Sequence, residues 1–200
     1  MKRIRFIGTQ LGWAGGVSLT SLLAAWAAIA FLLESNAKLA IVFSVAAFVL
    51  DTLDGFLARK LGTASEFGRF LDSMVDAINY SVLAAVAVEQ VLLPGPLGFA
   101  VGFLILAGGI VRLVLFTVNG FESEGSTLYY TGIVTPHLTL AVVLIYLTTR
   151  LIDLSEWLIA GILVVLALGQ LSTVRTRKTG VLMFWIPASI LIAVGAVIWL

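Results

Sequence analysis

Residues 51–76 read DTLDGFLARKLGTASEFGRFLDSMVD, and this stretch places four aspartates between two long apolar runs. Asp51 and Asp54 are three positions apart, and Asp72 and Asp76 are four positions apart. On a helix, both spacings put the two members of a pair on one face. The short turn between the runs makes the two helices antiparallel neighbours. We therefore expect all four carboxylates to converge on one point.

The rest of the chain has the composition of a membrane protein. Of its 200 residues, 60% are hydrophobic and only 12% are charged, and the mean hydropathy is +1.11, whereas soluble domains contain about 25% charged residues. Cysteine is absent, which excludes disulfides and cysteine-ligated metal sites. So few basic residues argue against a nucleic-acid partner. We predict an integral membrane protein surrounded by lipid.

Polar segments divide the chain into seven apolar stretches. A membrane-spanning helix needs about 20 apolar residues. The stretches that meet this length are 15–34, 38–60, 66–92, 97–118, 129–149, 155–174 and 181–200. The loops between them are short, so the sequence predicts an all-α polytopic bundle that forms a single integral membrane domain over residues 1–200.

The basic residues predict the orientation of the bundle. Lys and Arg near the ends of spans are retained on the cytoplasmic side. With the N-terminus inside, ten of the twelve basic residues fall at or toward the inner face, and only Lys38 and Arg150 fall outside. We therefore expect the N-terminus and the aspartates to face the cytoplasm, in a prokaryotic cytoplasmic membrane.

Four aspartates inside such a chain require compensation. One Asp at the centre of a membrane helix costs about 2.5–3.5 kcal/mol, so four could cost on the order of 10 kcal/mol if unpaired. Arg59, Lys60 and Arg69 can offset one or two carboxylates at a hydrated helix end, but not four in two pairs. Oxygen ligands at this density suit Mg²⁺, Mn²⁺ or Ca²⁺ rather than zinc, and the only histidine, His137, lies on another predicted span. The pattern predicts a divalent metal site.

Small residues and one cation accompany the aspartates. Gly55 and Ala58 follow the second aspartate, and Gly68 lies one helical turn before the third. Without bulky side chains a ligand can approach the backbone closely, although small residues in membrane helices also serve helix packing. Arg59 is a fixed cation suited to phosphate oxygens. Together these features indicate a site for a nucleotide diphosphate.

The same stretch resembles the signature of the CDP-alcohol phosphotransferase family. That signature is D-x-x-D-G-x-x-A-R, eight residues, then G-x-x-x-D-x-x-x-D. Its eight fixed positions are all filled, by Asp51, Asp54, Gly55, Ala58, Arg59, Gly68, Asp72 and Asp76. The family has a core of six spans, so the seventh predicted span would be an additional C-terminal helix.

The resemblance implies an enzyme of phospholipid biosynthesis. Such an enzyme transfers a phosphatidyl group from a CDP-activated lipid, such as CDP-diacylglycerol, to a small alcohol and releases CMP. The resemblance implies that Asp51, Asp54 and Asp72 bind a pair of Mg²⁺ or Mn²⁺ ions, with Asp76 close to the metal and acting as the catalytic base. It assigns the nucleotide and diphosphate to Asp51, Gly55, Ala58, Arg59 and Gly68. It also implies a homodimer.

Later segments resemble the phosphatidylserine synthase branch of this family. The matching positions are Leu71, Asp72, Ser73, Asp76, Arg112, Leu113, Phe116, Gly132 and Pro136. The chain departs from the branch at three places. The branch has Ser-Phe-Gly where this chain has Asn79, Tyr80 and Ser81, a second arginine where it has Leu115, and an asparagine where it has Thr117. Asn79 and Arg112 are the candidate contacts to the acceptor, since arginine is the usual partner of a carboxylate. L-serine is the expected acceptor.

Other acceptors and one other function class fit part of the pattern. Choline, inositol and glycerol phosphate are alternative acceptors, and aromatic rings such as those of Tyr129 and Tyr130 could hold the quaternary ammonium of choline. A divalent-cation transporter would explain the four carboxylates but not Gly55, Ala58 and Gly68 at fixed spacing. A catalytically inactive member that keeps the signature is a third alternative.

Overall fold

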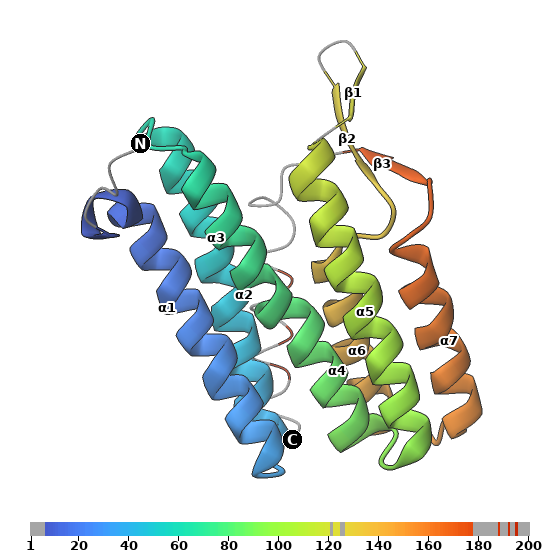
Figure 1. Cartoon of the computed structure of the whole chain (residues 1–200). Coiled ribbons are helices and arrows are strands. Elements are labelled where there is room, and N and C mark those ends of the chain that lie inside the picture. Colours follow the sequence, from blue (N-terminus) through green and yellow to red (C-terminus); the bar gives the residue numbers. More distant parts are fainter. Residues whose placement is uncertain are drawn as a thin grey trace.

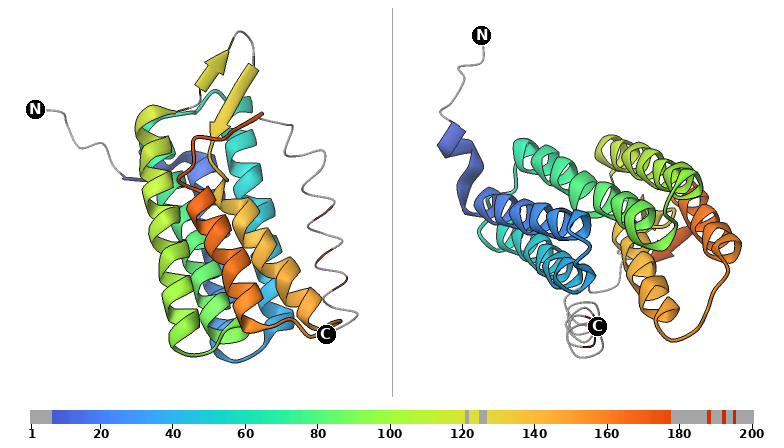
Figure 2. Two further views of the ribbon diagram at one scale, coloured as in Figure 1. Left: turned by 90° about the vertical axis from the view of Figure 1, so that its right-hand side faces the viewer. Right: turned by 90° about the horizontal axis from the view of Figure 1, so that it is seen from below.

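The computed structural model describes residues 7–120, 122–124 and 127–177, together with the isolated positions 188, 192 and 195. In these ranges, long helices lie side by side in an elongated bundle, and a small sheet projects from one end (Figures 1 and 2). The predicted seventh span, residues 181–200, falls outside the described residues apart from the three isolated positions.

The first two helices form an antiparallel pair. Helix α1 (Ile7–Leu33) is interrupted near its start by Gly12, whose φ of 54° and ψ of −174° are not helical. Because only glycine adopts such a conformation readily, the straight part of α1 begins close to the predicted start of the first span. Helix α2 (Ala37–Lys60) follows a tight turn, and the side chain of Asn36 caps it by accepting a 3.1 Å hydrogen bond from the Leu39 amide.

The predicted span 66–92 is one continuous helical rod with two changes of helix type. The rod consists in order of α3 (Glu66–Asp76), η1 (Ala77–Val82), α4 (Leu83–Ala87) and η2 (Val88–Leu92). The side chain of Ser65 caps α3 by accepting a 3.0 Å hydrogen bond from the Gly68 amide. Segments η1 and η2 are π-helical, so each hydrogen bond reaches five residues back and the helix is locally wider.

Three further helices complete the described bundle. They are α5 (Pro96–Asn119), α6 (Thr135–Thr149) and α7 (Glu156–Gly169). Helices α5 and α6 carry proline in their first turn, where the missing N–H has no helical partner to lose. The largest apolar core of the described residues lies among α4, η2, α5, α6 and α7 and includes the buried side chains Val88, Ile105, Leu138 and Leu163.

The sheet lies at one end of the bundle, which we call the sheet end. Strand β1 (Glu122–Glu124) pairs antiparallel with β2 (Thr127–Thr131), which pairs antiparallel with β3 (Arg175–Arg177). In this register Tyr129 lies opposite Arg177. The segment after α5 and the segment after α7 are thus joined in one sheet at the same end of the bundle (Figure 1).

The sheet corrects two predicted span boundaries. The fifth span was expected to begin at residue 129, but its helix begins at Thr135, and the sixth was expected to reach residue 174, but α7 ends at Gly169. The run TLYYT is rich in β-branched and aromatic residues, which favour a strand. Gly132, with a φ of +75°, turns the chain before the proline-initiated helix α6 begins.

Four helices in the described residues are long and apolar enough to cross a membrane: Leu11–Leu33, Ala37–Lys60, Glu66–Leu92 and Pro96–Asn119. Helices α6 and α7 are shorter but also apolar. A polytopic helical membrane protein is therefore confirmed, while the count of six or seven spans stays a prediction. Lys38 and Arg150 lie at the end opposite the sheet, since Lys38 is in the first turn of α2 and Arg150 directly follows α6 (Figure 1).

Candidate active site

Three of the four signature aspartates form an acidic cluster. Asp51 on α2 and Asp72 and Asp76 on α3 each bring one carboxylate oxygen within 4.8 Å of the others. Like charges this close cannot all remain ionised without a counter-charge, and a donor set made only of oxygen suits a hard divalent cation. The Oδ1 atom of Asp76 is buried and has no hydrogen-bond partner among the described residues, as expected of an oxygen held for a ligand. The cluster therefore fits a divalent metal ion.

Asp54 does not join this cluster, contrary to the expectation that all four carboxylates converge. Its side chain is buried, with 3% of its surface exposed, and it accepts a hydrogen bond from the Ser18 hydroxyl of α1. The hydroxyl supplies a partner that the helical spacing of the aspartates could not reveal. Asp54 thus lies where α1 and α2 meet, one turn along α2 from Asp51.

A chain of hydrogen bonds fixes Asp51. The Tyr80 hydroxyl donates to it at 2.7 Å, and the Asn79 amide nitrogen lies 3.5 Å from its other oxygen. Asn79 also donates to the Ser21 hydroxyl at 2.8 Å, and Ser21 donates to the carbonyl of Ala47 at 2.8 Å. Because these residues belong to α1, α2 and η1, the hydrogen bonds hold Asp51 in place relative to all three segments.

Two consecutive residues of η1 reach one carboxylate. Asn79 and Tyr80 stand three and four positions after Asp76, so both lie on the same face of the helical rod as Asp76 and both can contact Asp51. From α6, the Thr139 hydroxyl donates to the Tyr80 carbonyl at 3.1 Å. Sequence reasoning singled out Asn79 as an acceptor contact and missed the role of Tyr80, for which the spacing of four residues from Asp76 was the available signal.

The residues expected around the diphosphate lie near the cluster at the sheet end. A Cβ atom added to Gly55 would lie 3.3 Å from Nη1 of Arg59, so the guanidinium covers this glycine. The positive charge of Arg59 acts on the carboxylates of Asp54 and Asp72. A Cβ added to Gly68 would meet only the hydroxyl of its own helix cap among the described atoms. Ala58, on α2, is half-buried.

Arg112 lies beside the cluster on α5. Only 6% of its surface is exposed, and its Nε atom is buried without a hydrogen-bond partner in the described part of the chain. The groups that act on its charge are the Asp76 carboxylate and the Tyr130 hydroxyl of β2. Burial raises the pKa of the Tyr130 hydroxyl, and the guanidinium of Arg112 offsets part of that rise. Arg112 is therefore a buried cation with at least one N–H group, that of Nε, that no described residue accepts.

Two of the departures from the phosphatidylserine synthase pattern, both on α5, have different structural settings. Thr117 donates to the carbonyl of Leu113, and its oxygen lies 2.7 Å from the Ser73 hydroxyl, so this position links α5 to α3 without an asparagine. Leu115 is 50% exposed and therefore faces away from the interior of the bundle. An arginine at that position would point away from Arg112 and the carboxylates.

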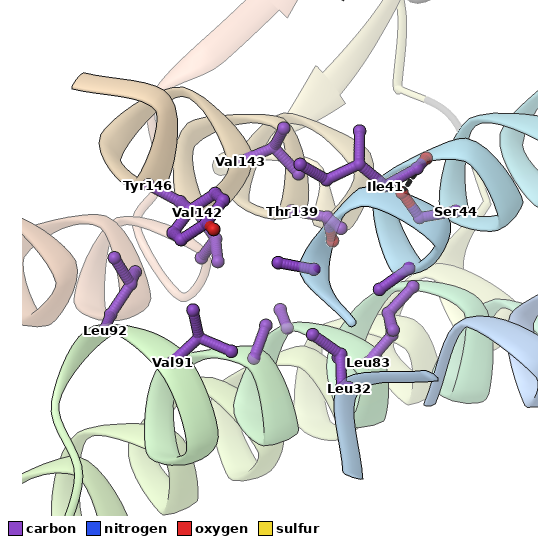
Figure 3. A pocket seen from close by; sticks show the side chains of 14 residues that line it. Leu32, Ile41, Ser44, Leu83, Val91, Leu92, Thr139, Val142, Val143 and Tyr146 are labelled. Carbon is purple, nitrogen blue, oxygen red and sulfur yellow. Dashed lines mark hydrogen bonds between the residues drawn. The ribbon is translucent and has the colours of Figure 1, made fainter. Parts of the chain in front are cut away.

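An apolar pocket lies deeper in the bundle, toward the end opposite the sheet. Side chains from α1, α2, α4, η2 and α6 point into it (Figure 3). Its lining is apolar apart from Ser44, Thr139 and Tyr146. Thr139 connects the pocket with the acidic cluster, because the hydroxyl that lines the pocket also holds the Tyr80 carbonyl.

Several curated relatives resemble this chain over part of their length. A CDP-diacylglycerol–serine O-phosphatidyltransferase of Mycobacterium leprae is 35% identical over 58% of this chain and 38% of its own length. One of Helicobacter pylori is 31% identical over 66% of this chain and 57% of its own length. An archaetidylserine synthase of Methanothermobacter thermautotrophicus is 28% identical over 74% of this chain and 63% of its own length. The chain thus matches less than two thirds of each of these proteins.

The family comparison extends over almost the whole sequence. A family model described as CDP-alcohol phosphatidyltransferase matches residues 13–200. The match includes the helices that carry the acidic cluster, Arg59 and Arg112. By this match the chain belongs to the CDP-alcohol phosphatidyltransferase family.

Proposed function

We propose that this protein transfers a phosphatidyl group from a CDP-activated lipid to the hydroxyl of L-serine and releases CMP. The observation that carries the proposal is the acidic cluster of Asp51, Asp72 and Asp76, in which one buried oxygen of Asp76 has no partner in the part of the chain that the structure describes. Serine is the favoured acceptor because relatives from two bacteria and one archaeon carry serine in their names.

Metal binding is assigned to the signature aspartates. Asp51, Asp72 and Asp76 would hold the first Mg²⁺ or Mn²⁺ ion, and Asp54 would contribute to a second ion by turning away from Ser18. When bound, such ions neutralise the diphosphate and make CMP a better leaving group. Tyr80 and Asn79 would orient Asp51 as a ligand, since hydrogen bonds to a metal-binding carboxylate fix its direction.

The other residues would bind the donor and move one proton. The Arg59 guanidinium would pair with oxygens of the diphosphate, and the backbone near Gly55 and Gly68 would let the nucleotide approach closely. The serine hydroxyl oxygen forms a bond to the β-phosphorus as the bond from that phosphorus to the CMP oxygen breaks. Asp76 takes the hydroxyl proton, late in the attack, because an ordinary aspartate is a weak base.

The apolar pocket supports a lipid as the donor. Thr139 connects it to Tyr80 of the active site, and it is lined almost entirely by apolar side chains, the surroundings that an acyl or ether-linked chain requires. A donor of this kind would reach the site laterally from the bilayer, while serine would arrive from the aqueous side.

Several finer features remain predictions of the family resemblance and the charge pattern. These are a single domain over residues 1–200, a homodimer, a prokaryotic cytoplasmic membrane and an active site that faces the cytoplasm. The location of Lys38 and Arg150 at the end opposite the acidic cluster agrees with that orientation, because basic residues mark the cytoplasmic side by their excess.

CMP release by the purified protein tests the proposal. The protein in detergent is given CDP-diacylglycerol and Mn²⁺, and CMP is measured with L-serine, choline, inositol, glycerol 3-phosphate or no acceptor. A parallel series uses an ether-linked CDP-lipid as the donor. We expect CMP release that depends on both the metal ion and L-serine.

The alternatives give different results in the same assay. Release with another alcohol but not with L-serine would keep the family chemistry and reject serine as the acceptor. A second measurement is the rise in melting temperature on addition of CDP with Mn²⁺. If neither donor gives CMP with any alcohol and CDP with Mn²⁺ does not raise the melting temperature, the proposed transferase activity is refuted.

A further inference from the structure

Two polar side chains that the family signature does not include are buried beside Arg112. Gln170, the residue after α7, is 3% exposed, and its amide nitrogen Nε2 is buried with no hydrogen-bond partner in the described ranges. Ser81 on η1 is 2% exposed, and its hydroxyl is also buried without a partner in these ranges. Leaving a buried donor unpaired is costly, so two such donors near an active site indicate a missing ligand.

A pair of glycines on α5 brings these two side chains together. A Cβ atom added to Gly109 would contact the Ser81 hydroxyl and would lie 3.4 Å from Oε1 of Gln170. A Cβ added to Gly108 would lie 3.4 Å from Nε2 of Gln170. Both side chains therefore pack directly against one glycine surface of α5.

Arg112 lies on the same face of α5, one turn from these glycines. Residues three and four positions apart are neighbours on a helix surface, and Arg112 stands three after Gly109 and four after Gly108. Its buried Nε atom is a third donor without a partner among the residues that the structure describes. Three such donors, one of them on a cation, thus gather against one stretch of α5 near Asp76.

The backbone around Gln170 holds its side chain in this position. The Ile133 amide donates to the carbonyl of Gly169 at 3.0 Å. A Cβ added to Gly132 would contact the carbonyl of Gln170. The end of α7 therefore packs tightly against the segment that joins β2 to α6, and Gln170 enters the site from a rigid support.

We propose that Gln170 and Ser81 complete, with Arg112, a subsite that binds the carboxylate of the acceptor. One guanidinium matches a single negative charge, and an amide N–H and a hydroxyl can donate to the carboxylate oxygens. A second cation, which a phosphate-bearing acceptor would favour, is absent from these three side chains. This inference rests on the proposed function, and it explains selection of L-serine without the second arginine that Leu115 replaces.

The test compares Gln170→Leu with the matched control Gln90→Leu, because Gln90 is exposed on η2. For Gln170→Leu we expect KM for L-serine to rise about 10- to 100-fold, the loss typical of a hydrogen bond to a charged group, with KM for CDP-diacylglycerol unchanged. Calorimetric titration with L-serine should show the same loss of affinity without turnover. Gln90→Leu should behave as the wild-type protein.

Other results would overturn the subsite and are distinguishable from a failure of the proposed function. An active wild-type protein with unchanged KM for L-serine in Gln170→Leu refutes the subsite alone. Equal loss of affinity for L-serine and for ethanolamine, which lacks the carboxylate, refutes carboxylate binding. A wild-type protein that neither binds L-serine nor uses it refutes the proposed acceptor and the subsite together. If Gln170→Leu does not fold, Ser81→Ala, which removes a single oxygen atom, serves in its place.

Discussion

The hydrogen bond from Tyr80 to Asp51 offers the sharpest test of how the acidic cluster is organised. Tyr80→Phe removes one hydroxyl but keeps the ring, whose edge packs on Phe48 with centroids 6.4 Å apart. The lost bond is 2.7 Å long, partly buried and made to a carboxylate, and hydrogen bonds to charged groups contribute about 1.5–3 kcal/mol. At about 1.4 kcal/mol per tenfold change, the Mn²⁺ concentration for half-maximal CMP release should rise about 10- to 100-fold.

The assay is a Mn²⁺ titration of CMP release, accompanied by the Mn²⁺-dependent rise in melting temperature, which needs no turnover. At saturating Mn²⁺ we expect most of the activity to return, because the hydroxyl orients a ligand and does not react. Tyr146→Phe is the matched control, since this ring lines the apolar pocket away from the carboxylates (Figure 3). Half-saturation within twofold of the wild-type value in Tyr80→Phe would show that Asp51 does not depend on this bond.

Three more substitutions test other parts of the site. Asp76→Asn should lower CMP release by about 10²- to 10⁴-fold, the contribution of a general base, and should still be protected from heat by CDP with Mn²⁺; unchanged turnover would remove Asp76 from the base role. Ser18→Ala leaves Asp54 buried without its hydroxyl partner and should lower unfolding stability by about 1–3 kcal/mol, measured as a lower melting temperature, whereas Thr20→Ala on the exposed face of α1 should change little. Gly109→Ala forces a methyl group against Ser81 and should lower unfolding stability by about 1–3 kcal/mol through overpacking, again measured as a lower melting temperature. In the control Gly161→Ala, the added methyl group meets nothing within 4 Å. Equal melting temperatures for the two variants would contradict the close approach of Gly109 to Ser81.

The location of the cluster could be predicted from the sequence because it depends on local spacing. Residues three and four apart share a helix face whatever the surroundings, and the predicted span 66–92 has the boundaries that the structure gives to its helical rod. Asp51, Asp72 and Asp76 therefore meet as expected. Asp54 does not, because its partner Ser18 lies on another helix and no pattern within residues 51–76 encodes it.

The remaining features depend on contacts between distant segments. The strand at residues 127–131 pairs with residues 175–177, a contact that apolar content alone could not predict, so the segment was assigned to a span. The approach of Gln170 to Ser81 depends on two glycines of α5, which in a membrane helix are most simply explained by packing. The hydrogen bond from Tyr80 to Asp51 joins η1 to α2, and local spacing places Tyr80 near Asp76 without specifying its partner on the other helix.

The π-helical segment η1 also sets the rotational phase of the helical rod. Within a π-helical turn the chain accommodates one residue more than an α-helical turn, which offsets the following residues by about 100°. Leu83 and Ala84 face the apolar pocket in this phase, while Asp72 and Asp76 precede the offset. Deleting a single residue within Ala77–Val82 would therefore leave the carboxylates aligned with α2 and turn the pocket-lining residues toward other neighbours. The length of η1 thus lets Asp72 and Asp76 face Asp51 on α2 while Leu83 and Ala84 of the same rod face the apolar pocket.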